Sequence, residues 1–201
     1  MIVTGVTKID SRRQKVMLDN EYVFSLYNSE IKKYNIEEEC YVDEDFVNKI
    51  EKEVLYPRAK DRALYILGRC DKTEKQLRDK LAESFYPQCI IDSVVELLKS
   101  YGYVDDERYA HSYIKMKQSV KSRKKIECEL IQKGVNMQII KNAFDDECED
   151  SELDALRNLL NKTKYKSMLD DKISRNKVVA SMMRRGFVYE QITRCIDEIV
   201  N

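Results

Sequence analysis

A segment that recurs three times along the chain constrains its fold more than any other feature. The copies span residues 73–95, 122–144 and 174–196 and align without a gap. One apolar pattern repeated at nearly equal spacing indicates tandem units that contact mainly their neighbours in the sequence. Five apolar columns coincide in all copies: Leu77, Ile126 and Val178; Leu81, Leu130 and Met182; Tyr86, Val135 and Phe187; Ile91, Ile140 and Ile192; Val95, Phe144 and Ile196.

Each copy has the pattern of a helix, a turn and a second helix. Thr73, Ser122 and Ser174 precede the first apolar column, where a hydroxyl can accept hydrogen bonds from the unpaired N–H groups of a first turn. Gln76 completes a capping box with Thr73. The three hydroxyl residues are therefore predicted to be helix N-caps.

The turn inside each copy is marked by the residue that ends its first helix. Gly134 and Gly186 stand at this position in the second and third copies, and glycine adopts the positive φ that ends many helices. The first copy has Phe85 there instead. We therefore expect the first turn to differ from the other two.

A further helix is predicted ahead of each copy. In the middle copy it begins at Asp105 or Asp106, acids suited to the positive end of a helix dipole. Tyr101 and Tyr103 flank Gly102 just before it and are predicted to fill the seam between two units, with base stacking as the alternative. The residues predicted to share the inner face of this helix are Tyr109, Tyr113, Met116 and Val120.

The predicted fold class is mainly α: an elongated, curved array of three tandem three-helix repeats with a small strand-containing N-terminal element. The repeats are expected at 59–106, 107–150 and 151–201. Residues 1–58 differ, because "VTGVTKID" and "YVFSLY" favour strands, whereas "DEDFVNKIEKEVLY" favours an acid-capped helix. We expect the repeats to fold without residues 1–58, because their apolar columns close on one another.

Composition excludes several classes of protein. The 201 residues include only five Gly and two Pro, which favours helices. No apolar run approaches the roughly 18 residues of a membrane span. The start, "MIVTGVTKID", lacks the layout of a signal peptide, so a cytoplasmic location is expected.

The residue types that carry enzyme chemistry are sparse or scattered. The glycines are isolated, so a phosphate-binding loop is not expected, and His111 is the one histidine, interpreted as a packing residue. The six cysteines form no C-x-x-C pair, so no metal site and no cofactor is predicted. We expect no enzyme activity. The cysteines predicted to act as small hydrophobic residues in helices are Cys70, Cys89, Cys128 and Cys195.

One stretch resembles a known family. "GYVDDERYAHSYI" at 102–114 closely resembles the G-Y-[LIV]-D-D-x-[RK]-[FY]-A signature of the RecX family of bacterial regulatory proteins. "LIQKGVNMQII" and "MMRRGFVYEQI" are similar to that family's recurring L-x-x-K-G-[FVI] turn, and the resemblance covers roughly 59–200. Phe85 departs from that turn. The residues that match the junction signature, interpreted as structural, are Gly102, Tyr103, Asp105, Asp106, Arg108, Tyr109 and Ala110.

The resemblance implies a function and a partner. Members of this family bind the recombinase RecA and its nucleoprotein filament, and usually inhibit ATP hydrolysis, strand exchange and filament growth. The resemblance further implies a curved array of three-helix repeats without catalytic residues. A monomer with weak direct contact to single-stranded DNA is the accompanying expectation.

Two other functions compete with this interpretation. Paired helices and basic blocks suggest an autonomous helix-turn-helix DNA-binding protein, although the formal net charge of zero argues against it. A helical scaffold with solvated charges would explain the repeats. It would not explain the segregated charge: residues 107–144 carry 9 basic and 3 acidic side chains, 145–154 carry seven acids, and 155–194 carry 10 basic and 3 acidic side chains.

The basic side chains near two predicted helix starts, together with those near the turns that follow, are the candidate site. Cations follow Ser122 and Ser174 at once, which is the wrong sign for the positive end of a helix dipole. We interpret them as facing an anionic partner, a filament surface or DNA backbone, with plain solvation as the alternative. The candidate partner- or DNA-binding residues are Arg123, Lys124, Lys125, Lys133, Arg175, Lys177, Arg184 and Arg185.

Overall fold

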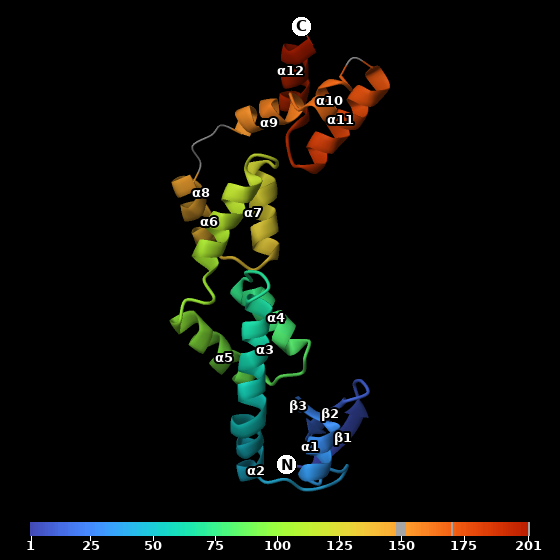
Figure 1. Cartoon of the computed structure of the whole chain (residues 1–201), viewed down its shortest axis with the longest axis vertical. Helices are drawn as coiled ribbons and strands as arrows, with labels where there is room; N and C mark the ends of the chain where they lie inside the picture. Colours follow the sequence, from blue (N-terminus) through green and yellow to red (C-terminus); the bar gives the residue numbers. More distant parts are fainter. Residues whose placement is uncertain (148–151, 170, 201) are drawn as a thin grey trace. The chain divides into compact units, whose positions relative to one another are not determined.

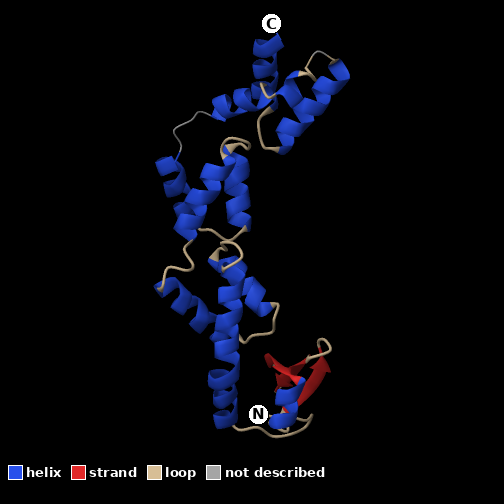
Figure 2. Cartoon of the chain, viewed as in Figure 1, coloured by secondary structure: helices blue, strands red, loops and turns tan. Residues whose placement is uncertain are grey.

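The protein folds into two compact units. The structure is a computed structural model that describes residues 1–147, 152–169 and 171–200. One unit is Met1–Asp105 and the other begins at Asp106 (Figure 1). As predicted, the fold is mainly helical, with a small sheet at the N-terminal end of the chain (Figure 2). None of the described helices is long and apolar enough to span a membrane.

The sheet of the first unit has three antiparallel strands. They are β1 (Val3–Lys8), β2 (Arg13–Leu18) and β3 (Tyr22–Tyr27), in the order β1-β2-β3. Strands β1 and β3 coincide with the predicted segments, whereas β2 was not predicted. In β2 the buried residues Val16 and Leu18 alternate with more exposed ones, as in a strand with one face on a core.

Six helical segments follow the sheet in this unit. Asp43 caps α2 by accepting a hydrogen bond from the Phe46 N–H at 2.7 Å, which confirms the predicted acidic cap. Segment η1 is a π-type turn just ahead of Pro57, whose ring nitrogen cannot donate to the preceding turn. The segments are α1 (Asn28–Lys33), α2 (Glu44–Ile50), η1 (Glu51–Leu55), α3 (Tyr56–Leu67), α4 (Glu74–Ala82) and α5 (Gln88–Ser100).

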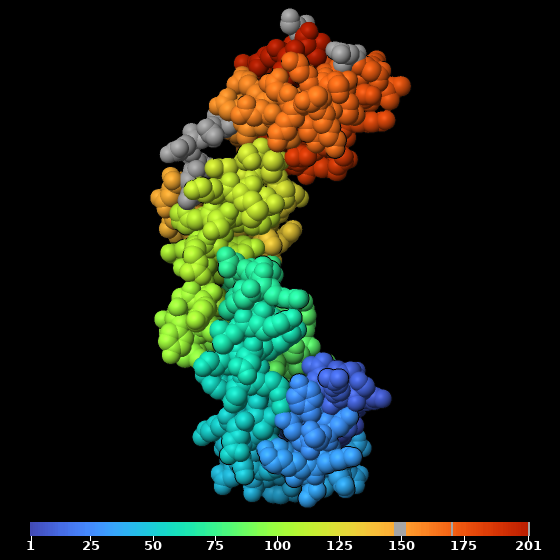
Figure 3. Space-filling model, viewed as in Figure 1, coloured from blue at the N-terminus to red at the C-terminus, as the bar shows by residue number. Residues whose placement is uncertain are grey.

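The sheet and the helices of the first unit share one hydrophobic core. Val16 and Phe24 from the sheet belong to the same buried cluster as Leu77 and Val94 from the helices. The atoms of the sheet lie directly against these helices in the space-filling view (Figure 3). Strand side chains therefore complete the core of the first repeat, contrary to the premise that its apolar columns close on one another. Folding of the repeats without residues 1–58 stays a prediction.

The second unit has two separate cores. One, which includes Ile114, Leu130 and Phe144, joins α6, α7 and α8. The other, which includes Leu159 and Ile192, joins the helices that follow. The helices are α6 (Asp106–Lys117), α7 (Arg123–Gln132), α8 (Met137–Glu147), α9 (Glu152–Leu160), α10 (Thr163–Lys166), α11 (Lys172–Arg184) and α12 (Tyr189–Val200).

The turns inside the three copies have the same geometry. Phe85 has φ 61°, in the same left-handed region as Gly134 at 91° and Gly186 at 95°. In the first copy the Phe85 N–H donates to the Ala82 carbonyl at 2.8 Å, and the equivalent bonds at both glycines are 2.9 Å. These bonds fit a Schellman motif. The prediction that the first turn differs is wrong, because its hydrogen bonds hold a phenylalanine where glycine is usual.

The predicted N-caps are correct in two of the three copies. Thr73 and Ser122 cap α4 and α7, and Thr73 forms the predicted capping box with Gln76. Ser174 is not a cap: α11 begins three residues earlier, where the Asp171 carboxylate accepts from the Ser174 N–H at 2.8 Å. A helix prefers an anionic cap at its positive end, so it continues toward the N-terminus as far as Asp171.

Several side chains predicted to be buried lie at the surface. Tyr101 and Tyr103 are 68% and 55% exposed, so neither fills a seam. The inner face of α6 is formed by Ala110 and Ile114, while Met116 is 60% exposed. Helix α6 does begin at Asp106, as predicted. Among the cysteines predicted to be hydrophobic, Cys195 is buried, whereas Cys70, Cys89 and Cys128 are exposed.

Candidate partner interface

The start of α7 is enclosed by the second unit itself. Ser122 is 1% exposed, and its hydroxyl accepts from the Lys125 N–H at 3.2 Å. The Arg123 N–H donates to the Glu152 carboxylate of α9 at 3.1 Å. The backbone N–H groups of Arg123 and Lys125 are thus already paired within the chain. An anionic partner would therefore contact side chains at this helix start and not these two N–H groups.

The turn after α11 packs on this helix start. The Ser122 N–H donates to the Arg185 carbonyl at 3.0 Å, and Gly186 lies against Ser122 and Lys125. The Arg185 guanidinium donates to the Val120 carbonyl at 3.3 Å and to the Tyr165 hydroxyl at 2.9 Å. Arg185 was predicted as a contact residue, but its guanidinium donates hydrogen bonds to groups of the same chain.

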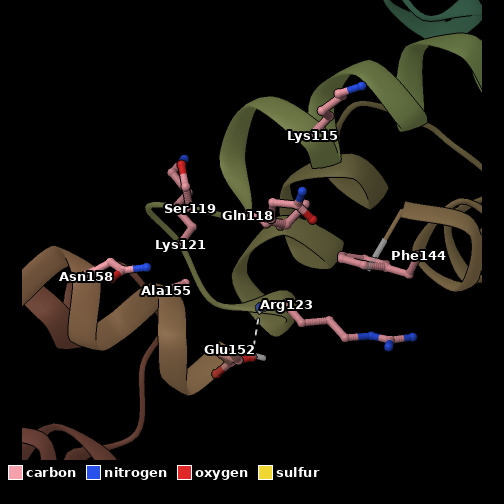
Figure 4. A pocket seen from close by; sticks show the side chains of 10 residues that line it. Lys115, Gln118, Ser119, Lys121, Arg123, Phe144, Glu152, Ala155 and Asn158 are labelled. Atoms are coloured by element: carbon pink, nitrogen blue, oxygen red, sulfur yellow. Dashed lines mark hydrogen bonds between the residues drawn. The ribbon is translucent and has the colours of Figure 1, made fainter. Parts of the chain in front are cut away.

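A cavity of about 350 Å³ lies beside the α7 start. Lys115 and Gln118 come from α6 and the residues after it, and Asn158 comes from α9 (Figure 4). The Arg123 side chain runs away from Glu152, and its guanidinium lies 4.6 Å from the centre of the Phe144 ring. Of the eight candidate residues, only Arg123 lines this cavity. The wall combines cations, amides and one carboxylate with the apolar side chains of Ile126, Phe144 and Ala155.

Three more of the candidate cations are held within the second unit. Arg175 is paired with Asp197 of α12. The Lys133 ammonium lies 5.9 Å from the Tyr109 ring centre and 5.4 Å from the Tyr113 ring centre. Lys125 is half-buried where Gly186 approaches it. These side chains serve packing and internal electrostatics, which reduces what they can offer to a partner.

The remaining candidates project into solvent. Lys124, Lys177 and Arg184 are exposed and form no ion pair with any residue that the structure describes. Lys177 and Arg184 are seven residues apart on α11, which places them on the same helix face. The structure thus separates the eight predicted residues into five engaged cations and three available ones.

One ionic cluster in this unit was not predicted. The Lys121 ammonium lies 2.6 Å from a Glu129 carboxylate oxygen, and the Tyr113 hydroxyl donates to the same carboxylate at 2.7 Å. Burial pushes the pKa of Glu129 upward, but the hydrogen bonds from Lys121 and Tyr113 outweigh it and leave the pKa below its ordinary value. Only the charge count of residues 107–144 hinted at this cluster, since its members are distant in sequence.

Further cations without an ion pair to a described residue were also not named from the sequence, although Lys117 and Lys164 lie near the Tyr113 and Tyr165 rings. None of them forms an ion pair within the described part of the second unit. They account for much of the excess of basic over acidic side chains in residues 107–144 and 155–194. That charge excess is the sequence signal that could have pointed to them. They are Lys115, Lys117, Lys141, Lys162, Lys164, Lys166 and Lys172.

Comparison with known proteins gives a consistent set of relatives. The first three-helix domain of RecX matches residues 59–98, and the second three-helix domain of RecX matches residues 105–143. The regulatory protein RecX of Clostridium acetobutylicum is 33% identical, with 96% of this chain and 95% of the relative covered. The regulatory protein RecX of Clostridium tetani is 29% identical, with 97% and 92% covered.

Two solved structures share the fold. A crystal structure of a regulatory protein RecX covers 98% of both chains with a TM-score of 0.59 at 20% sequence identity. The crystal structure of RecX from Lactobacillus salivarius covers 72% of this chain and 96% of its own, with a TM-score of 0.57 at 24% identity. At these identities, the likeness bears on the fold alone.

Proposed function

Because the chain belongs to the RecX family of regulatory proteins, we propose that it binds the recombinase RecA and the filament that RecA forms on DNA. Binding would inhibit ATP hydrolysis, strand exchange and filament growth in recombination and DNA repair. The proposal places the protein in the cytoplasm, as a monomer without a cofactor. The family is named for regulation, and the protein itself is expected to catalyse no reaction.

The observation that carries this proposal is the exposed, unpaired charge of the second unit. Lys124, Lys177 and Arg184 extend from α7 and α11 without an ion pair to any described residue. Surface cations that are not neutralised internally accelerate association with an anionic partner and strengthen it at low salt. A filament built on DNA offers such a partner through its phosphates and its acidic protein surface.

Co-sedimentation with RecA assembled on single-stranded DNA tests the proposal. We expect the unaltered protein to pellet with the filament and to lower its ATP hydrolysis. The variant Lys124→Glu, Lys177→Glu, Arg184→Glu should pellet at least about tenfold more weakly, with a reduced salt dependence. Its fold should be unchanged, since these side chains make no ion pair with a described residue.

A matched variant controls for charge alone. Lys49→Glu, Lys52→Glu, Lys75→Glu makes the same charge change at exposed positions of the first unit and should bind the filament as the unaltered protein does. Equal loss in both variants would overturn the assignment of the surface. Pelleting as strong on DNA alone as on the filament would favour an autonomous DNA-binding protein.

Two finer statements remain predictions under this proposal. Purified protein should hydrolyse no ATP and cut no DNA, as measured against a mock purification from cells that lack the gene. The division into repeats at 59–106, 107–150 and 151–201 can be checked by limited proteolysis, which should cut first near those boundaries.

A further inference from the structure

A second basic cavity lies in the first unit, outside the surface described above. Its volume is about 680 Å³, and residues of the sheet and of α3 line it. Its walls come from the β1–β2 turn, the start of β2, strand β3, helix α3 and the turn after α4. Four arginines line it: Arg12, Arg13, Arg58 and Arg62.

Two of these arginines are held in place by acids of the same unit. Arg13 forms an ion pair with Asp10 at 2.8 Å. Arg58 is paired with Glu30, and its guanidinium lies 4.4 Å from the centre of the Tyr27 ring. An ion pair and a ring contact fix a guanidinium in one orientation, so these two side chains form a preorganised part of the wall.

The other two arginines have no ionic partner. Arg12 and Arg62 form no ion pair with any described residue, although Arg62 lies 5.6 Å from the centre of the neighbouring Tyr65 ring. Both side chains are exposed at the mouth of the cavity. Their guanidinium donors are therefore available to a ligand that enters it.

A largely buried tyrosine at the cavity wall keeps its hydroxyl available. Tyr86 is 8% exposed and lines the cavity, but its hydroxyl makes no hydrogen bond with a residue that the structure describes. Burial raises the pKa of this hydroxyl, although nearby Arg58 and Arg62 oppose the rise. The hydroxyl is thus a neutral hydrogen-bond donor near guanidinium groups, and a ligand that enters the cavity can accept a hydrogen bond from it.

We propose that this cavity binds the phosphate group of a nucleotide, either free or within a single strand. Guanidinium forks from separate elements match the oxygens of a phosphate, and the Tyr86 hydroxyl can donate to a further oxygen. Asp61, an acid at the same wall without an ion pair to a described residue, would repel a bare anion. It can accept from the N–H and O–H donors that a nucleotide carries besides its phosphate. The volume falls within the usual range of small-molecule sites.

This site is independent of RecA binding. Its residues lie in the first unit, whereas Lys124, Lys177 and Arg184 lie in the second. An experiment without RecA therefore tests the cavity by itself, and either proposal can fail while the other stands.

Fluorescence anisotropy of a labelled oligothymidylate with the full chain tests the cavity. The variant Arg12→Gln, Arg62→Gln should bind about tenfold more weakly, because it removes two charge-assisted contacts. The slope of log affinity against log salt should also fall by about 1 to 1.5, as expected for the loss of two phosphate contacts to a single strand. The control variant Lys52→Gln, Lys75→Gln removes the same charge at exposed positions outside the cavity and should change neither quantity.

A second variant separates recognition from folding. Tyr86→Phe keeps the buried ring and removes only the hydroxyl, so affinity should fall by about twofold to fivefold with an unchanged melting temperature. Competition identifies the source of the phosphate: displacement by thymidine monophosphate assigns a free nucleotide, and displacement by unlabelled oligonucleotide alone assigns a strand. Equal effects of the arginine and lysine variants would overturn the proposal, as would displacement by polyglutamate as effective as that by oligonucleotide.

Discussion

The same turn is used in both units to attach a neighbouring element, but the neighbours differ. In the first unit the Ser84 carbonyl of the turn accepts from the Ser25 hydroxyl of β3 at 3.0 Å, and the Phe85 ring lies 5.8 Å from the Lys15 ammonium of β2. In the second unit the turn at Arg185 and Gly186 receives the buried start of α7.

This difference explains which side chain each turn can carry. Next to the sheet there is room for a phenylalanine, even at positive φ. At Gly186, an added Cβ would collide with the Ser122 hydroxyl and lie 2.6 Å from the Lys125 Cβ. Two separate reasons therefore require glycine at residue 186: the positive φ of the backbone and the lack of space for a Cβ atom.

The units also differ in how their elements are joined. The first unit buries sheet and helices in one core. The second has two cores, and polar contacts such as Ser122 N–H to the Arg185 carbonyl and Arg123 N–H to Glu152 run between their helices. Hydrophobic burial is shared cooperatively across a continuous core. A defect should therefore spread through the whole first unit but stay local in the second.

The largest expected effect comes from removing one phenylalanine from each unit. Phe24 and Phe144 are both 2% exposed, so Phe24→Ala and Phe144→Ala should each cost about 3–5 kcal/mol. Hydrogen exchange should show lost protection in both the sheet and α5 for Phe24→Ala. For Phe144→Ala, the loss should be confined to α6, α7 and α8, with α12 still protected. Retained protection of α5 in Phe24→Ala would contradict a shared core.

The next effect concerns the crowded glycine. Gly186→Ala should destabilise the second unit by about 3 kcal/mol or more, because it adds a steric overlap to the cost of a positive φ. Gly102 has φ 70° and an added Cβ would meet nothing within 4 Å, so Gly102→Ala should cost only about 1 kcal/mol. Chemical denaturation of both variants measures the difference. Equal costs would show that the turn does not pack on Ser122.

A smaller effect isolates the backbone cost in the first turn. Phe85→Gly and Phe85→Ala lose the same ring, but only alanine keeps a Cβ at positive φ. Phe85→Gly should therefore be more stable than Phe85→Ala by about 1 kcal/mol, the reverse of the usual order for these two residues. The usual order, with alanine more stable in urea denaturation, would mean that residue 85 is not left-handed.

The smallest effect tests a polar contact of the second unit by its pH dependence. The folded-state pKa of Glu129 is lowered, so its stabilisation is present above the ordinary carboxyl pKa and is lost as pH falls through the folded value. Glu129→Gln should cost about 1 kcal/mol at pH 7 and close to nothing in strongly acidic solution. Glu127→Gln, on the same helix, removes the same charge without breaking an ion pair to a described residue and serves as the matched control. A cost independent of pH would argue against the ion pair with Lys121.

Local sequence predicted the helical copies well because their signals are short-range. All fifteen residues of the five apolar columns are buried, since a helix presents residues with this spacing on one face. Thr73 and Ser122 are caps for the same reason: capping joins a hydroxyl to an N–H only three residues away. Strand β2 was missed because "RQKVML" becomes a strand only between its two partners.

The candidate site was less predictable because availability of a charge depends on distant neighbours. Arg185 and Lys124 look alike in the sequence, yet one is hydrogen-bonded to Tyr165 and the other projects into solvent. The basic cavity of the first unit was not predicted at all. Its arginines come from the β1–β2 turn, the start of β2 and α3, which only folding brings together.

The sequence by itself determined the repeated helices, the glycine turns, most of the caps and the resemblance to the RecX family. Each of these depends on residues within a few turns of one another. The tertiary structure alone decided that the sheet completes the core of the first unit, that the start of α7 is enclosed, and which cations remain available. Those outcomes depend on pairings such as Ser122 with Arg185, and contacts between residues so far apart in the chain leave no local pattern.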